Sequence, residues 1–161
     1  MSKIKTILVV CTGNSCRSVM AEGLLQAALK DKGDYDIISA GVAAPQGMRP
    51  TAETVQVMSE QGLDISNHRS ALLNNEMIEQ ADLILVMELR HKVTIANLAP
   101  AAEGKINLLA EFGRMEGEYR LVNPDIADPI GKPLNFYRQV FKIIQEAVER
   151  TTRKLAEQDK E

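Results

Sequence analysis

The sequence predicts a three-layer α/β sandwich built around a parallel sheet of four strands. Short apolar runs alternate with helical patterns along the chain, and the run over residues 82–87 is apolar on both faces. A strand of that kind belongs in a sheet that helices cover on both sides. Alternation of strands and helices favours parallel βαβ units, so the two observations predict the same architecture.

Each expected strand is a short aliphatic or β-branched run bounded by charged or turn-forming residues. The four strands are expected over residues 5–10, 35–40, 82–87 and 105–109.

Helices are expected where apolar side chains recur at helical spacing, or where glycine and proline mark an end. The ranges are 18–32, 51–61, 74–81, 88–98 and 134–157, and residues 111–127 are expected to be loop. Gly62 is the expected end of the second helix. On the last helix, the residues expected to face the core are Phe136, Val140, Ile143, Ile144, Ala147, Val148 and Leu155.

Composition limits both the size and the partners of the protein. The 161 residues, 45% of them hydrophobic and 25% charged, are typical of one globular domain, which we expect to span residues 1–161. A net charge of -3 gives no basic surface for nucleic acid. No apolar run is long enough to span a membrane, and the first residues do not form a signal peptide. We therefore expect a cytoplasmic protein with no nucleic-acid or membrane partner.

The chain has two cysteines, Cys11 and Cys16, which are too few and too close to form a disulfide framework. A reducing compartment fits this pattern. Neither His68 nor His91 stands at a familiar zinc-ligand spacing from them. The sequence therefore predicts no metal and no cofactor.

The segment from residue 10 to residue 18 carries the main functional signal. Cys11 ends a predicted strand, and Arg17 stands six positions later at the start of a helix. A loop bent between such elements turns its backbone N–H groups inward, which makes an anion site that stabilises a thiolate. Arg17 can offer two parallel donors to a phosphate, and Gly13 suits a positive φ angle. The residues expected to line this phosphate cup are Thr12, Gly13, Asn14, Ser15, Cys16, Arg17 and Ser18.

The simpler interpretation is that both cysteines are small buried apolar residues. A cysteine followed six and seven positions later by Arg and by Ser or Thr has a chance frequency on the order of 1%. Its position between a strand and a helix makes chance a weaker explanation still. Neither the Walker A pattern nor the Rossmann glycine pattern is present, which argues against a nucleotide site.

Residues 10–18, followed by Met20-Ala21-Glu22, closely resemble the signature of the low-molecular-weight protein tyrosine phosphatases. The resemblance implies a flavodoxin-like fold and hydrolysis of phosphotyrosine through a phosphocysteine intermediate. It also implies a phosphorylated protein as substrate, inorganic phosphate or a similar oxyanion in the loop, and a monomer or weak dimer. It extends to Ser39-Ala40-Gly41, His68-Arg69-Ser70, residues 81–87 and residues 125–129.

Phosphoryl transfer to a thiolate also needs a proton donor for the leaving group, and later a base for water. Asp125 and Asp128 are candidates on one late loop, and Asp128 followed by Pro129 matches the family's acid. Pro129 holds Asp128 in an extended conformation. We therefore expect Cys11, Arg17 and Asp128 to be the catalytic residues.

Short polar side chains are expected to support the loop. Asn14 and Ser18 can lock it, and Ser18 can donate to the Cys11 thiolate. The resemblance adds Ser39 and His68 to this network, and it implies that Cys16 traps oxidised Cys11 as a disulfide. His91 has no such support in the resemblance and is expected to face solvent.

The substrate is less firmly predicted than the reaction. Residues 42–48 and 130–131 contain no aromatic side chain that could flank a phenyl ring, which weakens phosphotyrosine as a substrate. Ser15 resembles the threonine of bacterial protein arginine phosphatases, so phosphoarginine is the second candidate. An arsenate reductase of the same fold would need further cysteines to relay a disulfide. A non-catalytic phosphate-binding or redox-sensing module would not need Asp128.

Overall fold

The computed structural model describes residues 3–115, 117–118 and 123–160, and four parallel strands form its sheet. In the order β2-β1-β3-β4 they are β2 (Asp36–Gly41), β1 (Thr6–Cys11), β3 (Leu83–Val86) and β4 (Ile106–Leu108). This confirms the predicted sheet, with each strand bound within two residues of its expected range.

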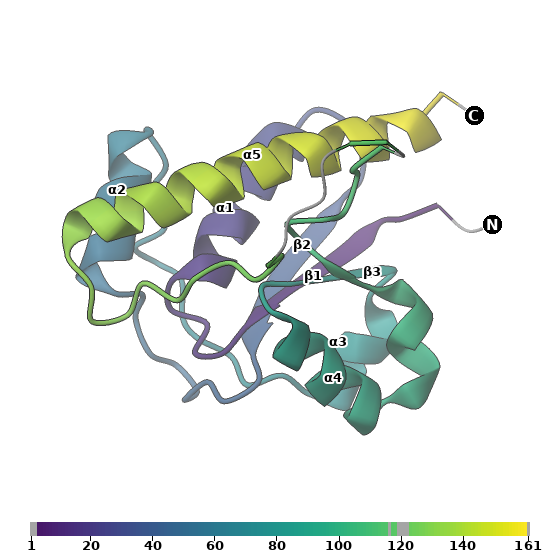
Figure 1. Cartoon of the computed structure of the whole chain (residues 1–161), viewed down its shortest axis with the longest axis horizontal. Helices are drawn as coiled ribbons and strands as arrows, with labels where there is room; N and C mark the ends of the chain where they lie inside the picture. The colour runs from purple at the N-terminus through teal and green to yellow at the C-terminus, as the bar shows by residue number, and fades with distance from the viewer. Residues whose placement is uncertain (1–2, 116, 119–122, 161) are drawn as a thin grey trace.

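Helices cover both faces of the sheet, which confirms the three-layer sandwich (Figure 1). α1 (Arg17–Leu29), α2 (Ala52–Glu60) and α5 (Leu134–Gln158) pack together on one face. α3 (Asn75–Gln80) and α4 (Leu89–Leu98) lie on the other. A short 3₁₀ helix (Pro100–Lys105), which the sequence did not predict, connects α4 to β4.

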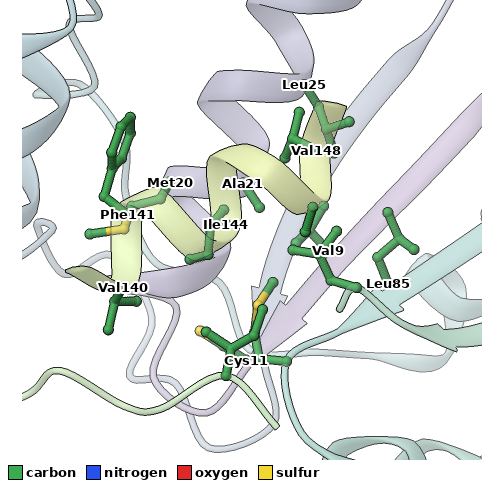
Figure 2. Packing of buried hydrophobic residues seen from close by; sticks show 14 of the residues in the cluster. Val9, Cys11, Met20, Ala21, Leu25, Leu85, Val140, Phe141, Ile144 and Val148 are labelled. Carbon is green, nitrogen blue, oxygen red and sulfur yellow. The ribbon is translucent and has the colours of Figure 1, made fainter. Parts of the chain in front are cut away.

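The central strand β1 divides the core into two parts. Ile7 and Val9 pack beneath α1 and α5, whereas Leu8 and Val10 pack beneath α3 and α4. All four side chains are fully buried, as expected for a strand apolar on both faces. Figure 2 shows Cys11 at the end of this strand, at the border of the packed residues.

The long helix α5 buries a stripe slightly different from the predicted one. Tyr137 and Phe141 are buried, whereas Ile143 is 47% exposed, so the prediction for Ile143 was wrong. Ile143 and Ile144 are neighbours in sequence and therefore point about 100° apart on a helix. Only Ile144 can join the stripe that faces α1.

The carboxyl ends of the strands bring the functional loop into place. The loop after β1 packs directly over Gly41, the last residue of β2, and a Cβ added there would lie 2.4 Å from the Thr12 carbonyl oxygen. Gly41 is therefore needed for close approach of the two backbones. In the described ranges, no helix is both long and apolar enough to cross a membrane.

Candidate active site

The loop between β1 and α1 closes around the sulfur of Cys11. The backbone N–H of Asn14 donates to Cys11 Sγ at 3.2 Å, and α1 begins at Arg17. Asn14, and not Gly13, takes the positive φ angle, at 51°. The expectation for Gly13 was wrong because Asn tolerates this conformation and its side chain is held by hydrogen bonds on several sides.

Ser18 lies beside the Cys11 thiol, with 2.9 Å between Oγ and Sγ. The side-chain amide of Asn14 donates to Ser18 Oγ at 2.8 Å, so the hydroxyl hydrogen of Ser18 is free to point at the sulfur when Cys11 is a thiolate. A hydroxyl that donates to sulfur stabilises the thiolate over the thiol. Both side chains are fully buried, which keeps water from competing for these bonds.

The side chain of Asn14 connects the loop to two other segments. Its amide nitrogen also donates to Ser39 Oγ at 2.9 Å, and its amide oxygen accepts the backbone N–H of Ala71. His68 lies 3.2 Å from the Asn14 carbonyl oxygen through Nε2, and 3.3 Å from Glu22 through Nδ1. The structure thus brings together the four residues expected to support the loop.

Arg17 is only 2% exposed, and its guanidinium is held by groups from two later segments of the chain. Its Nη1 donates to Glu88 Oε2 at 2.7 Å and to the Ile126 carbonyl oxygen at 2.6 Å. Glu88 was not predicted as a site residue. It follows β3 at the carboxyl edge of the sheet, where ligands of such folds bind, and that position was the available signal.

Glu88 is ionised at all ordinary pH values. Burial alone would raise the pKa of its carboxyl, but hydrogen bonds from Arg90 and Arg17 outweigh burial and lower it to about 2. One carboxylate therefore serves two guanidinium groups.

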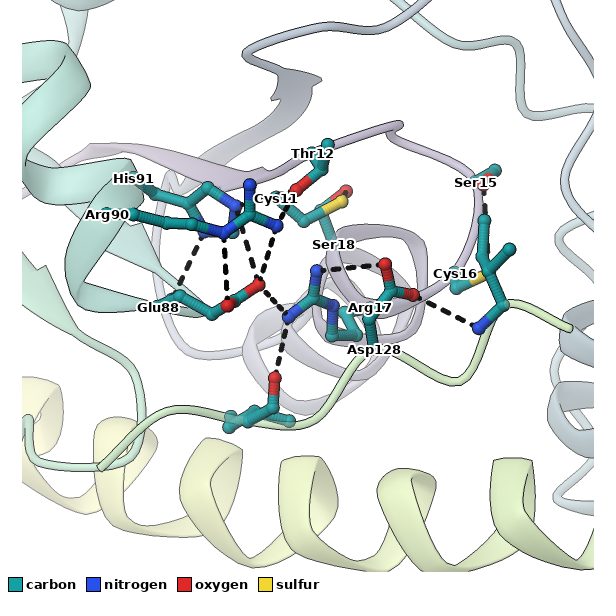
Figure 3. A network of polar contacts seen from close by, with 12 residues as sticks. Cys11, Thr12, Ser15, Cys16, Arg17, Ser18, Glu88, Arg90, His91 and Asp128 are labelled. Carbon is teal, nitrogen blue, oxygen red and sulfur yellow. Dashed lines mark hydrogen bonds and ion pairs between the residues drawn. The ribbon is translucent and has the colours of Figure 1, made fainter. Parts of the chain in front are cut away.

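Asp128 comes within reach of the same arginine. Its Oδ2 lies 3.6 Å from Arg17 Nη2, and its Oδ1 accepts the backbone N–H of Ile130 at 3.1 Å. The side chain is 41% exposed and faces the loop from the segment before α5 (Figure 3). Asp125 instead accepts the N–H of Leu89 at the start of α4, which separates the two candidate acids.

His91 is fully buried, so the expectation that it faces solvent was wrong. It is the third residue of α4, where its Nδ1 accepts the backbone N–H of Glu88 in a capping box. Its Nε2 must then carry the proton and donate to Thr12 Oγ1 at 2.9 Å. Burial, helped by the charge of Arg17, lowers the pKa of His91 to about 4, which keeps the ring neutral.

Cys16 is buried behind the loop among hydroxyl groups. Its sulfur lies 3.5 Å from Thr51 Oγ1, 3.7 Å from Tyr137 Oη and 3.7 Å from Ser15 Oγ. Burial raises the pKa of Tyr137 to about 12, against an opposing contribution from the Thr51 hydroxyl. Thr51 and Tyr137 were not predicted, because they come from segments far apart in sequence.

The geometry is that of a buried thiol in a strand-to-helix loop, with an arginine and a carboxylic acid beside it. The family model of the low molecular weight phosphotyrosine protein phosphatases matches residues 6–161. The chain therefore belongs to this family of hydrolases, which confirms the resemblance predicted from the loop and its flanking segments.

Individual members of the family are similar to this chain over nearly its whole length. "Probable low molecular weight protein-tyrosine-phosphatase EpsP" of Ralstonia nicotianae is 40% identical, over 91% of this chain and 92% of its own. A protein-arginine-phosphatase of Geobacillus stearothermophilus is 36% identical, over 92% of this chain and 95% of its own. An arsenate reductase of Staphylococcus aureus is 34% identical, over 90% and 94%.

Solved structures give the same result. A low molecular weight protein tyrosine phosphatase from T. tengcongensis superimposes with a TM-score of 0.84 at 37% identity, over 93% of this chain and 99% of that one. The tyrosine phosphatase Wzb of Escherichia coli K30 in complex with phosphate gives 0.81 at 32% identity, over 94% and 92%. Phosphate binding is thus observed in a protein of the same fold.

Proposed function

We propose that this phosphatase hydrolyses phosphotyrosine in proteins through a phosphocysteine intermediate. Cys11 is the nucleophile, Arg17 holds the phosphoryl group, and Asp128 is the acid and later the base. The observation that carries the proposal is the pair of polar contacts on Cys11 Sγ, one with the Ser18 hydroxyl and one from the Asn14 backbone N–H. A merely structural cysteine would not need two buried polar groups at its sulfur.

The reaction has two steps that return the enzyme to its starting state. The Cys11 thiolate attacks phosphorus, and the bond to the tyrosine oxygen breaks as Asp128 gives that oxygen a proton. Water then attacks the phosphocysteine while Asp128 takes a proton from it, and the sulfur leaves as a thiolate. The hydrogen bond from Ser18 makes the sulfur a better leaving group.

Arg17 can bind an anion while its side chain stays fixed by its present partners. Its Nη1 donors are already used by Glu88 and the Ile126 carbonyl. Within the described residues, Nε and Nη2 have no hydrogen-bond partner, and Nη2 lies 3.6 Å from Asp128 Oδ2. These two nitrogens can bind two phosphoryl oxygens in the parallel geometry in which arginine binds phosphate best. Backbone N–H groups of residues 12–18 supply the rest of the anion site.

Phosphotyrosine is the preferred substrate over phosphoarginine because of the groups at the mouth. Ile130 follows the Asp128-Pro129 pair, and Met48 ends the loop whose first residues, Val42 and Ala43, donate to the Cys11 and Thr12 carbonyls. Both side chains are exposed and apolar, which suits a phenyl ring. Arg90 lies against Thr12 of the cup, and its positive charge opposes a guanidinium leaving group. Phosphoarginine stays the second candidate, because of Ser15 and the similarity to a protein-arginine-phosphatase.

Kinetics with para-nitrophenyl phosphate, a phosphotyrosine peptide and a phosphoarginine peptide test this proposal. We expect wild-type activity on the first two and none with Cys11→Ser. Faster turnover of phosphoarginine would reverse the order of substrates, and turnover of none would favour a binding module.

The proposal includes one catalytic domain over residues 1–161 that works in the cytoplasm. The family match over residues 6–161 and the two free cysteines support it. Reversible oxidation, with Cys16 trapping oxidised Cys11 as a disulfide, belongs to the same proposal. Arsenate reduction is disfavoured because the sequence has no third cysteine to carry a disulfide onward.

A further inference from the structure

Arg90 is a second arginine at the mouth of the phosphate cup. It lies in the first turn of α4, and its Nη2 donates to Thr12 Oγ1 at 2.7 Å. Thr12 directly follows Cys11 in the chain. In Figure 3, the guanidinium groups of Arg90 and Arg17 share Glu88, and Asp128 stands on the opposite side of Arg17.

The guanidinium of Arg90 is held on one edge and open on the other. Its Nε and Nη2 donate to the two oxygens of Glu88, each at 3.1 Å. Nη1 has no acceptor within the part of the chain that the structure describes, and the side chain is 58% exposed. A guanidinium that is already fixed loses little conformational freedom when it binds an anion.

Three carboxylates act on Arg90, namely Glu88 through hydrogen bonds and Asp128 and Asp125 through their charge, and they raise its pKa. Glu88 Oε2 also accepts from Arg17 at 2.7 Å, so one carboxylate is shared by two cations. The nearby carboxylate of Asp125 is occupied by the N–H of Leu89. An anionic group of a substrate can therefore gain from a direct charge-assisted hydrogen bond to the open Nη1 of Arg90, and not from a net positive charge of this wall.

We infer that Arg90 forms a recognition site for a second anionic group of the substrate, a carboxylate next to the phosphotyrosine in the protein chain. This inference rests on the proposed function and specifies its substrate class as acidic phosphotyrosine segments. The phosphoryl group occupies the cup, and the neighbouring Asp or Glu side chain accepts from Nη1 of Arg90.

A purely structural role would give a different pattern of effects. If Arg90 only held Glu88 and Thr12 in place, its loss would change turnover of all substrates by the same factor. If Arg90 recognises a carboxylate, its loss changes the ratio between acidic and basic substrates.

The experiment compares three phosphotyrosine peptides that differ only in having Glu, Gln or Lys next to the phosphotyrosine. Affinity is measured with the Cys11→Ser protein, and kcat/KM with the protein that keeps Cys11, each with Arg90 and with Arg90→Gln. Arg138→Gln is the matched control, because Arg138 is also half-exposed and pairs with a carboxylate, Glu60, on the other face of the sheet.

We expect the Glu peptide to exceed the Lys peptide by about twofold to fivefold in affinity and in kcat/KM, an effect of the size of an exposed ion pair. Arg90→Gln should reduce this ratio to about one, and Arg138→Gln should leave it unchanged. Added salt should also reduce it in the wild type. Arg90→Lys should keep part of the preference.

Two results would overturn the inference: equal binding of the three peptides, or a ratio that Arg90→Gln does not alter. Failure of the proposed function looks different. In that case the protein with Cys11 hydrolyses none of the peptides, while the Cys11→Ser protein still prefers the Glu peptide through Arg90, which supports the inference.

Discussion

Two groups of side chains support the loop between β1 and α1 from opposite sides. One group acts through neutral hydrogen bonds and the other through pairs of charges. On the amide–hydroxyl side, Asn14, Ser18 and Ser39 form a buried chain of neutral hydrogen bonds to Cys11. On the guanidinium–carboxylate side, Arg17, Glu88 and Arg90 share one negative charge between two positive ones. Neutral bonds each contribute little and are insensitive to pH, whereas a buried charge depends strongly on its partner.

The largest expected effect on stability comes from Glu88→Gln, on the guanidinium–carboxylate side. This change leaves Asp128, at 3.6 Å, as the carboxylate that pairs with the buried Arg17, and should lower the free energy of unfolding by about 3–5 kcal/mol. Urea denaturation at pH 7 measures it. The pKa of Glu88 is about 2 in the folded chain against 4.5, so its contribution persists at neutral pH and is lost as pH falls from 4.5 towards 2.

Glu60→Gln is the control for that measurement. It removes the carboxylate partner of Arg138 in an exposed ion pair, and should cost far less than Glu88→Gln. Equal losses for the two variants would mean that the buried charge pair is no different from a surface pair.

The next effect is a pH dependence that comes from His91. Its pKa is about 4 in the folded chain and 6.5 in the unfolded chain, so the unfolded chain binds a proton first as pH falls. The contribution of neutral His91 to the free energy of unfolding is therefore complete above pH 6.5. It declines as the pH falls from 6.5 to 4, by as much as about 3 kcal/mol. Thermal unfolding of wild type and His91→Gln over this range checks it. The variant should show the flatter curve, and parallel curves would contradict a buried neutral ring.

The two sides also differ in how far the sequence predicts them. Cys11, Asn14 and Ser18 lie within one short motif, so spacing alone was enough to place them together. Glu88 lies 71 positions from Arg17, and His91 lies 79 positions from Thr12. Nothing local signals those contacts. The capping box of Glu88 and His91 was readable in principle, but Glu is not a favoured N-cap residue.

The fold was more predictable than the exact faces of its helices. The apolar runs of β1 and β3 stand out, because a strand buried on both faces has few polar residues. The segment from Val140 to Ile144 has four apolar residues among five, so several stripes are possible on α5. The packing of α1 against α5 decides that Phe141 is buried and Ile143 is not.

On the amide–hydroxyl side, Ser18→Ala should act mainly on the rate. Loss of its hydroxyl makes the Cys11 sulfur a poorer leaving group, so breakdown of the phosphocysteine should slow by roughly 10- to 100-fold. Stopped-flow measurements with para-nitrophenyl phosphate should then show a burst of nitrophenol. Ser39→Ala, which removes a partner of Asn14 but does not touch the sulfur, should slow turnover less. If Ser39→Ala slowed turnover more than Ser18→Ala, the bond between Asn14 and Ser39, and not the contact of Ser18 with the sulfur, would limit turnover.

The smallest effect is expected at the neutral hydroxyl cluster behind Cys16. Tyr137→Phe removes a buried hydroxyl 3.7 Å from the Cys16 sulfur, and should lower the free energy of unfolding by about 1 kcal/mol near pH 7. Because burial raises the pKa of Tyr137 from 10 to about 12, the folded chain keeps its proton longer than the unfolded chain. Wild-type stability should thus fall between pH 10 and 12 more steeply than that of the variant. Tyr35→Phe, near the surface, is the control, and an equal change of slope in both variants would show that Tyr137 is not specially buried.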